Sequence, residues 1–223
     1  MALPPEALPL TGIVVADFSR VLAGPLATMT LADLGARVIK IERPGEGDDT
    51  RHWGPPFSPT GSTYFESVNR NKESIELDLT TDADRAVAIA IASNADILVE
   101  NFKPGGAASL GLGYDELSVL NPGLIYASIS GFGSGRGAEL PGYDFIVQAV
   151  GGLMSITGDP EGPPMKVGVA VVDILTAKDA TIGILSALQA RNETGLGRRL
   201  EVNLLSSLQG ALANQGQSHL GAG

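Results

Sequence analysis

Residues 13–41, IVVADFSRVLAGPLATMTLADLGARVIKI, decide the fold of this chain. The apolar runs at 13–16 and 37–41 have the length and composition of buried strands. Between them, Gly35 follows a helical pattern and stands where a helix commonly ends. One face of that helix would carry the apolar side chains of Ala27, Leu31 and Leu34. The pattern predicts a β-α-β unit whose two strands run parallel, because a helical crossover joins parallel neighbours.

The same alternation of strand and helix continues along the chain. Further strands are predicted at 74–79, 96–99, 124–128 and 199–203, and an extended or strand-like segment at 167–172. Helices are predicted at 85–92, 114–120, 143–154, 174–191 and from 205 onward, with Asp82 or Asp84 capping the first of them. Polar, Gly-rich loops are predicted at 44–63 and 131–142. This order favours an α/β fold, a Rossmann-like parallel sheet flanked by helices, with residues 1–223 as one domain.

The composition narrows the possible partners. The chain has 25 acidic and 15 basic side chains, a net charge of −10, and no Cys. Such a charge would be repelled by phosphate backbones and anionic lipid surfaces. The absence of Cys excludes disulfides, thiolate metal sites and a Cys nucleophile. The sequence contains no secretory signal pattern and no apolar run near the roughly 20 residues that span a bilayer. We therefore expect a cytoplasmic protein with neither a nucleic-acid nor a membrane partner.

The polar residues point to carboxylate chemistry. Two His, His52 and His219, are too few for a multi-His metal site and argue against a Ser-His-Asp triad. The turn at 19–24 carries no dinucleotide fingerprint, and no phosphate-binding glycine loop ending in Lys-Ser/Thr is present. Asp173 stands alone among apolar residues at 167–175, where an ionised carboxylate is costly. Asp173 is either the N-cap of the following helix or a reactive acid, and the two roles are compatible.

Several longer motifs stand in a fixed order along the chain. They are LADLGARVIKIERPG at 31–45, NKESIELDL at 71–79, VENFKPG at 99–105, GGLMSITG at 151–158 and RNETGLG at 191–197. In this order they resemble the class III CoA-transferases, the family of formyl-CoA transferase, carnitine-CoA transferase and α-methylacyl-CoA racemase. The resemblance implies a CoA-binding, Rossmann-like large domain that belongs to an interlocked homodimer.

The resemblance also assigns a nucleophile. In that family a catalytic aspartate lies nine residues ahead of a segment similar to Ile182-Gly183-Ile184-Leu185, which places it at Asp173. The implied reaction moves CoA from an acyl-CoA donor to a carboxylic acid acceptor through covalent aspartyl intermediates. Coenzyme A would be a cosubstrate, with no permanently bound cofactor and no metal. A carboxylate is a weak nucleophile, so positioning and backbone oxyanion donors must supply much of the acceleration.

CoA contacts follow from the resemblance by position. They are Leu22, Ala23, Arg43, Leu77, Asp78, Leu79, Thr80, Asn101, Phe102 and Lys103. A guanidinium at Arg43 could hold a phosphate bidentately. For Arg43 and Lys103 the alternative is a solvated surface charge, and for Leu22 and Leu77 it is a place in the core.

Two positions depart from patterns seen in relatives. Ser109 stands where many relatives carry an Arg that contacts phosphate, so phosphate binding would be weaker or supplied elsewhere. Tyr143, before Asp144, stands where the racemases carry a His that moves a proton. A phenol with an ordinary pKa near 10 is poorly suited to that task at neutral pH, which favours transfer over racemisation. Tyr143 would line the acyl pocket with Asp144, or belong to the core.

Members of that family are longer, and we expect residues 1–223 to correspond to their large domain without the C-terminal small domain. The alternatives to a CoA-transferase are an acyl-CoA racemase or epimerase on the same fold, or an inactive CoA-binding fragment that needs a partner chain. The sequence does not identify the acyl donor or the acceptor acid.

Overall fold

A computed structural model describes residues 8–222 and contains one large sheet. Its six strands follow the order β5-β2-β1-β6-β7-β8, and each neighbouring pair is parallel. The strands are β1 (Val14–Asp17), β2 (Arg37–Glu42), β5 (Lys72–Glu76), β6 (Ile97–Glu100), β7 (Ile125–Ser130) and β8 (Arg198–Asn203). The Rossmann-like parallel sheet predicted from the sequence is confirmed. The strand order reverses between β1 and β6, which is where doubly wound sheets open a crevice at the carboxyl ends of their strands.

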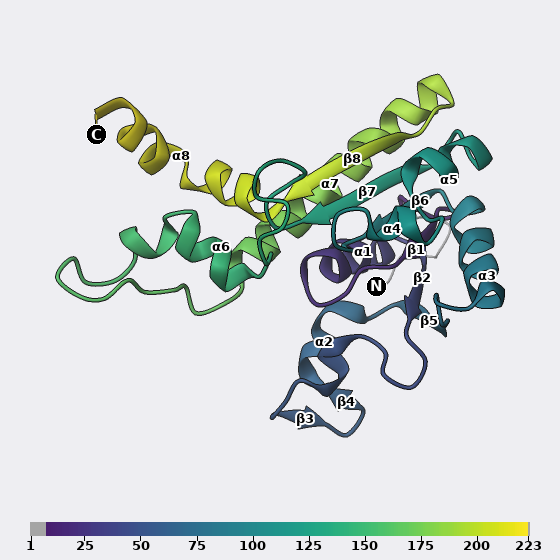
Figure 1. The fold of residues 1–223 in the computed structure, drawn as a ribbon, viewed down its shortest axis with the longest axis horizontal. Helices are drawn as coiled ribbons and strands as arrows, with labels where there is room; N and C mark the ends of the chain where they lie inside the picture. The colour runs from purple at the N-terminus through teal and green to yellow at the C-terminus, as the bar shows by residue number, and fades with distance from the viewer. Residues whose placement is uncertain (1–7, 223) are drawn as a thin grey trace.

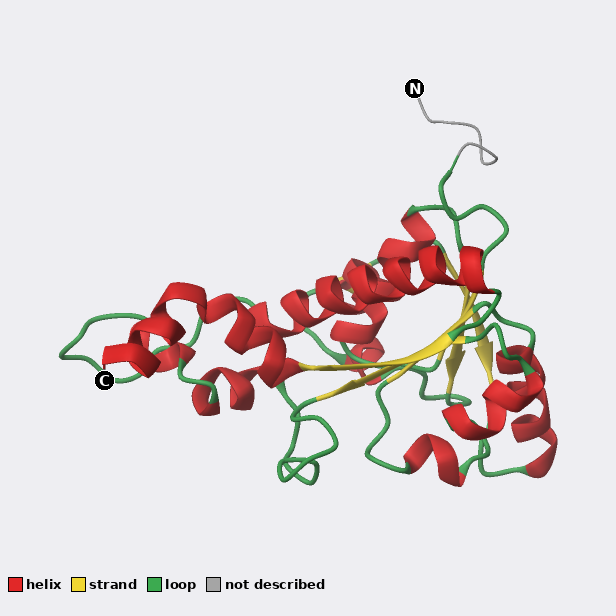
Figure 2. Cartoon of the chain, turned by 90° about the horizontal axis from the view of Figure 1, so that it is seen from above, coloured by secondary structure: helices red, strands yellow, loops and turns green. Residues whose placement is uncertain are grey.

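Helices cover both faces of the sheet (Figure 2). On one face α1 (Ala23–Asp33) packs against α7 (Val171–Thr194), and their Ala and Leu side chains meet the inward residues of β1, β2, β6 and β7. On the other face α3 (Asp82–Ser93), α4 (Gly106–Ser109) and α5 (Tyr114–Leu120) enclose a second core. Strands buried on both faces explain the continuous apolar runs of the sequence.

Two parts of the chain extend from this sheet (Figure 1). One is a lobe after β2, with η2 (Asp49–His52), the hairpin β3 (Phe57–Ser58) and β4 (Gly61–Ser62), and α2 (Thr63–Asn69). The other is an arm made of α6 (Asp144–Val150), η3 (Leu153–Ile156) and α8 (Leu204–Ala222). The arm exposes large apolar side chains, among them Phe145, Val150, Ile156 and Leu220. Exposed apolar side chains gathered on one arm are typical of an interaction surface.

Several local predictions from the sequence were wrong. Residues 44–63 were predicted as loop but contain η2 and the hairpin. Thr81, not Asp82 or Asp84, is the N-cap of α3, and its hydroxyl accepts from the backbone N–H of Asp84 at 3.3 Å. The helix predicted at 143–154 ends at Val150, because Gly152 has a φ of +86° and starts η3 instead. Of the two alternatives for residues 167–172, strand or extended chain, the strand was wrong: residues 167–170 belong to no strand and α7 begins at Val171.

Among the helices of residues 8–222, none combines the length and the apolar character that crossing a bilayer requires. The same residues contain no group of three or more His, Cys, Asp or Glu side chains arranged to hold a metal ion.

Candidate active site

Asp173 lies in the first turn of the 24-residue helix α7, at the edge of the sheet where the parallel strands end. It is not the N-cap. That position belongs to Ala170, which makes no side-chain capping bond, so the N-cap interpretation of Asp173 was wrong. Burial, and then the nearby charge of Asp144, raise the pKa of Asp173 to about 7. The carboxyl group therefore has no compensating cation strong enough to offset its desolvation.

Asp144 supplies the missing cap from a different helix. Its Oδ1 accepts from the backbone N–H groups of Val172 at 2.7 Å and Asp173 at 3.2 Å. Its Oδ2 accepts from Nε2 of Gln148 at 2.6 Å, and Oε1 of the buried Gln148 accepts from the N–H of Val167 at 2.9 Å. These bonds join the start of α6 to the segment that leads into α7. Asp144 thus fixes the backbone of Asp173 while its charge makes ionisation of Asp173 harder.

Tyr64 on α2 places the lobe near Asp144 and Asp173. Burial and then the charges of Asp173, Asp144 and Asp48 raise the pKa of Tyr64 to about 12. Its ring meets the ring of Trp53 edge-on, with centroids 5.1 Å apart. No motif or spacing in the sequence distinguishes Tyr64 from its neighbours. The only available signal was the length of the predicted loop at 44–63, which is unusual for an idle connection.

A cleft of about 490 Å³ opens at the carboxyl ends of β1, β2 and β5. Six of the residues predicted to contact CoA line it: Arg43, Leu77, Asp78, Leu79, Thr80 and Phe102. Arg43 is half-exposed and pairs with Asp49 at 2.9 Å, so its guanidinium is already engaged. Leu77 is 6% exposed and therefore belongs both to the core and to the cleft wall.

The remaining predicted site residues are not among those that line this cleft. The side-chain amide of Asn101, after β6, makes two hydrogen bonds to the turn after β1. Its Oδ1 accepts from the Arg20 N–H at 2.9 Å and its Nδ2 donates to the Arg20 carbonyl oxygen at 2.8 Å. Ala23 is buried at the start of α1, directly after Leu22. Lys103 lines a separate hollow of about 270 Å³. Tyr143 is 62% exposed, so the core, one of the two alternatives for this residue, was wrong.

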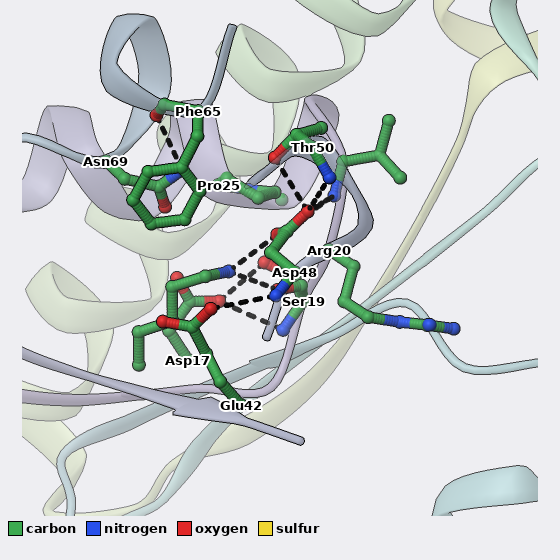
Figure 3. A network of polar contacts seen from close by, with 12 residues as sticks. Asp17, Ser19, Arg20, Pro25, Glu42, Asp48, Thr50, Phe65 and Asn69 are labelled. Atoms are coloured by element: carbon green, nitrogen blue, oxygen red, sulfur yellow. Dashed lines mark hydrogen bonds and ion pairs between the residues drawn. The ribbon is translucent and has the colours of Figure 1, made fainter. Parts of the chain in front are cut away.

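A buried network of charges lies beneath the same turn (Figure 3). Oδ2 of Asp17 accepts from Nζ of Lys72 at 3.0 Å, and Oδ2 of Asp48 pairs with Nζ of Lys40 at 2.9 Å. Burial alone would raise the pKa of Asp17, but the charges of Lys72 and Lys40 hold it at about 2. Burial lowers the pKa of Lys72 to about 8 against the opposing effect of Asp17. Sequence reasoning missed this network, although a Lys within the apolar strand at 37–41 was a visible signal.

The fold and the site together define a class of protein. It is a doubly wound α/β protein with a cleft at the switch point of its sheet and a partly buried, uncompensated carboxylate near that edge. Such a carboxylate is suited to proton transfer or to nucleophilic attack.

The comparisons identify the family. The model of CoA-transferase family III matches residues 10–223, and the chain belongs to that family. It is 46% identical to a succinate–glutarate CoA-transferase of Agrobacterium fabrum, over 99% of this chain and 57% of that protein. It is 49% identical to an acetyl-CoA:oxalate CoA-transferase of Acetobacter aceti, over 92% of this chain and 54% of that protein.

A solved structure agrees with these relatives. The crystal structure of a CAIB/BAIF family protein from Brucella suis superposes with a TM-score of 0.93 at 46% identity, covering 96% of this chain and 58% of that one. The chain thus spans little more than half the length of the relatives it matches.

Proposed function

We propose that the protein transfers CoA from an acyl-CoA donor to a carboxylic acid, with Asp173 as the covalent nucleophile. The observation that carries the proposal is the position of Asp173, partly buried and uncompensated in the first turn of α7. Membership of the family and the names of the two curated relatives support transfer to a small dicarboxylic acid. Coenzyme A would enter as a cosubstrate, in the cytoplasm, without a resident cofactor.

The chemistry needs four balanced steps. The Asp173 carboxylate attacks the acyl carbon of the donor thioester, which releases CoA thiolate and leaves a mixed anhydride. The thiolate attacks the aspartyl carbonyl, which releases the donor acid and leaves an aspartyl-CoA thioester. The acceptor carboxylate attacks that carbonyl and releases thiolate again, forming a second anhydride. Finally the thiolate attacks the acceptor's acyl carbon, which frees Asp173 and yields the new acyl-CoA.

The cleft supports binding of the CoA portion. The six predicted contacts that line it come from the ends of β2, β5 and β6, so they converge although they are far apart in sequence. We assign the phosphate contact to Arg43, which would exchange Asp49 for phosphate. The exposed apolar arm supports the further proposal that the active protein is an interlocked homodimer.

Mass spectrometry tests the nucleophile. The intact protein is mixed with succinyl-CoA, quenched and digested, and the peptide containing Asp173 is weighed. We expect an added mass of CoA or succinyl on that peptide in the wild type, and none in Asp173→Asn. An adduct on any other peptide, or an unchanged adduct in Asp173→Asn, contradicts the assignment. Deuterium exchange at the α-carbon of an acyl-CoA without transfer would instead support a racemase.

A further inference from the structure

The turn between β1 and α1 is held from three other elements. Asn101, after β6, brackets Arg20 with two hydrogen bonds. Lys40 on β2 donates from Nζ to the carbonyl oxygen of Ser19 at 2.8 Å. Asp48, before η2, accepts from the N–H of Val21 at 3.2 Å. These contacts from three separate elements hold the backbone of the turn in one conformation.

Val21 explains why the turn needs holding. Its φ is +72°, a left-handed conformation that it shares with only two other non-glycine residues among 8–222, Asn71 and Ala213. A β-branched residue adopts this conformation only with backbone strain. The turn is also tightly packed, because a Cβ on Gly24 would meet Cβ of Ser19 at 2.2 Å. Without the contacts that hold it, we expect Val21 to return to a negative φ, which would change the path of the turn.

The Asp48 carboxylate, which accepts from the Val21 N–H, is itself held in place by several contacts. Its carboxylate pairs with Nζ of Lys40 at 2.9 Å and accepts from the N–H and Oγ1 of Thr50 at 3.0 and 2.8 Å. Its own N–H donates to Oε2 of Glu42 at 2.8 Å. The side chains of Lys40 and Asp48 are 1% and 0% exposed. Figure 3 shows the bonds of Asp48 running to Thr50 and to the neighbouring backbone.

We propose that Asp48, anchored by Lys40, is a positioning residue that holds the strained Val21 turn in the conformation that binds CoA. The inference rests on the proposed function, because CoA is taken as the ligand of the adjoining cleft. Phe18 and Arg20 of this turn line that cleft together with Lys40 and Asp48. The turn also sets the start of α1 at Leu22 and Ala23. Without Asp48, relaxation of Val21 would displace these residues.

A double-mutant cycle tests the inference through binding rather than turnover. Calorimetry of the intact protein with free CoA is carried out for the wild type, Asp48→Asn, Val21→Gly and the double variant. We expect Asp48→Asn to weaken CoA binding about tenfold, because the Val21 N–H loses its charged acceptor. In the V21G background the same change should cost less than about threefold, because glycine adopts positive φ without strain.

Controls separate positioning from general destabilisation. Glu73→Gln also converts an acid to its amide, at an exposed ion pair with Arg37, and should leave CoA affinity unchanged. If Asp48→Asn does not fold, Thr50→Val removes one donor to Asp48 and should give a weaker loss that V21G again suppresses. Equal losses in both backgrounds, or no loss in Asp48→Asn, overturn the inference. A wild type that binds no CoA overturns the proposed function itself.

Discussion

Two groups of acids lie near the same edge of the sheet, and the pKa values of Asp17 and Asp173, one from each group, are shifted in opposite directions. Asp17 and Asp48 are fully buried and face Lys72 and Lys40, and the pKa of Asp17 is held at about 2. Asp173 faces another acid, Asp144, and its pKa is raised to about 7. Both groups are desolvated, so the difference comes from the presence or absence of a cation.

The comparison separates structure from reactivity. The lysine-paired acids connect β1, β2, β5 and the lobe, and they shape the turn beside the cleft. The unpaired acid contributes nothing comparable to stability, and its ionised form is disfavoured. An acid that is expensive to ionise, yet held in place by the cap from Asp144, has the features expected of a nucleophile.

The largest effect on stability is expected from breaking the paired group. Asp17→Asn leaves Lys72 buried without its carboxylate and should lower the free energy of unfolding by about 3–5 kcal/mol. The folded pKa of Asp17, about 2, lies below its ordinary value, so the wild type should lose this stabilisation as the pH falls from about 4 to 2. Denaturant unfolding of the intact protein at fixed concentration measures both effects. A loss below about 1 kcal/mol would contradict the contrast.

The stability contributed by Asp173 should change with pH in the opposite direction to that contributed by Asp17. Because the folded pKa of Asp173 lies above its ordinary value, the folded protein binds the proton more tightly, and stability falls as the pH rises from about 4 to 7. Asp173→Asn has no charge to desolvate and should raise the free energy of unfolding at pH 8 by roughly 2–4 kcal/mol. At pH 4 the variant and the wild type should be similar. A variant that is less stable at pH 8 would count against an uncompensated Asp173.

Removal of the cap should have a smaller and mixed effect. Asp144→Ala exposes the N–H groups of Val172 and Asp173 and should cost about 1 kcal/mol of stability. It also removes the like charge that raises the pKa of Asp173, so the pH midpoint of activity should move downward. A pH–rate profile of the intact enzyme shows the shift. An unchanged midpoint would mean that Asp144 acts through the cap alone.

The smallest change in the free energy of unfolding is expected at the exposed pair of Glu73 and Arg37, which serves as the control. Glu73 and Arg37 form an exposed bidentate pair, with both distances 2.8 Å. Glu73→Gln should change the free energy of unfolding by less than about 1 kcal/mol, because solvent screens such pairs. The same denaturant series provides the measurement. A larger loss would show that charge removal destabilises this protein regardless of burial, which would weaken the whole contrast.

The centre of the sheet was predictable because β1 and β6 carry apolar runs that are buried on both faces, whereas the edge strands β5 and β8 are polar and at most partly buried. Asp173 was also identifiable, as a lone acid in an apolar stretch. Its true cap was not, since Asp144 lies 28 residues away from Val172 and only the packing of α6 on α7 brings them together. Tyr64 and the Lys40–Asp48 pair were missed for the same reason. Their partners come from separate elements, and local sequence patterns carry no information on such contacts.

The most direct test of the account is the rate at which Asp173 becomes covalently modified, measured against pH. In single-turnover experiments with succinyl-CoA, the adduct on the Asp173 peptide is quantified between pH 5 and 9. We expect the rate to rise with pH and to level off above about 7, because only the ionised carboxylate attacks. A rate that is constant from pH 5 upward would show an acid with an ordinary pKa and would contradict the account.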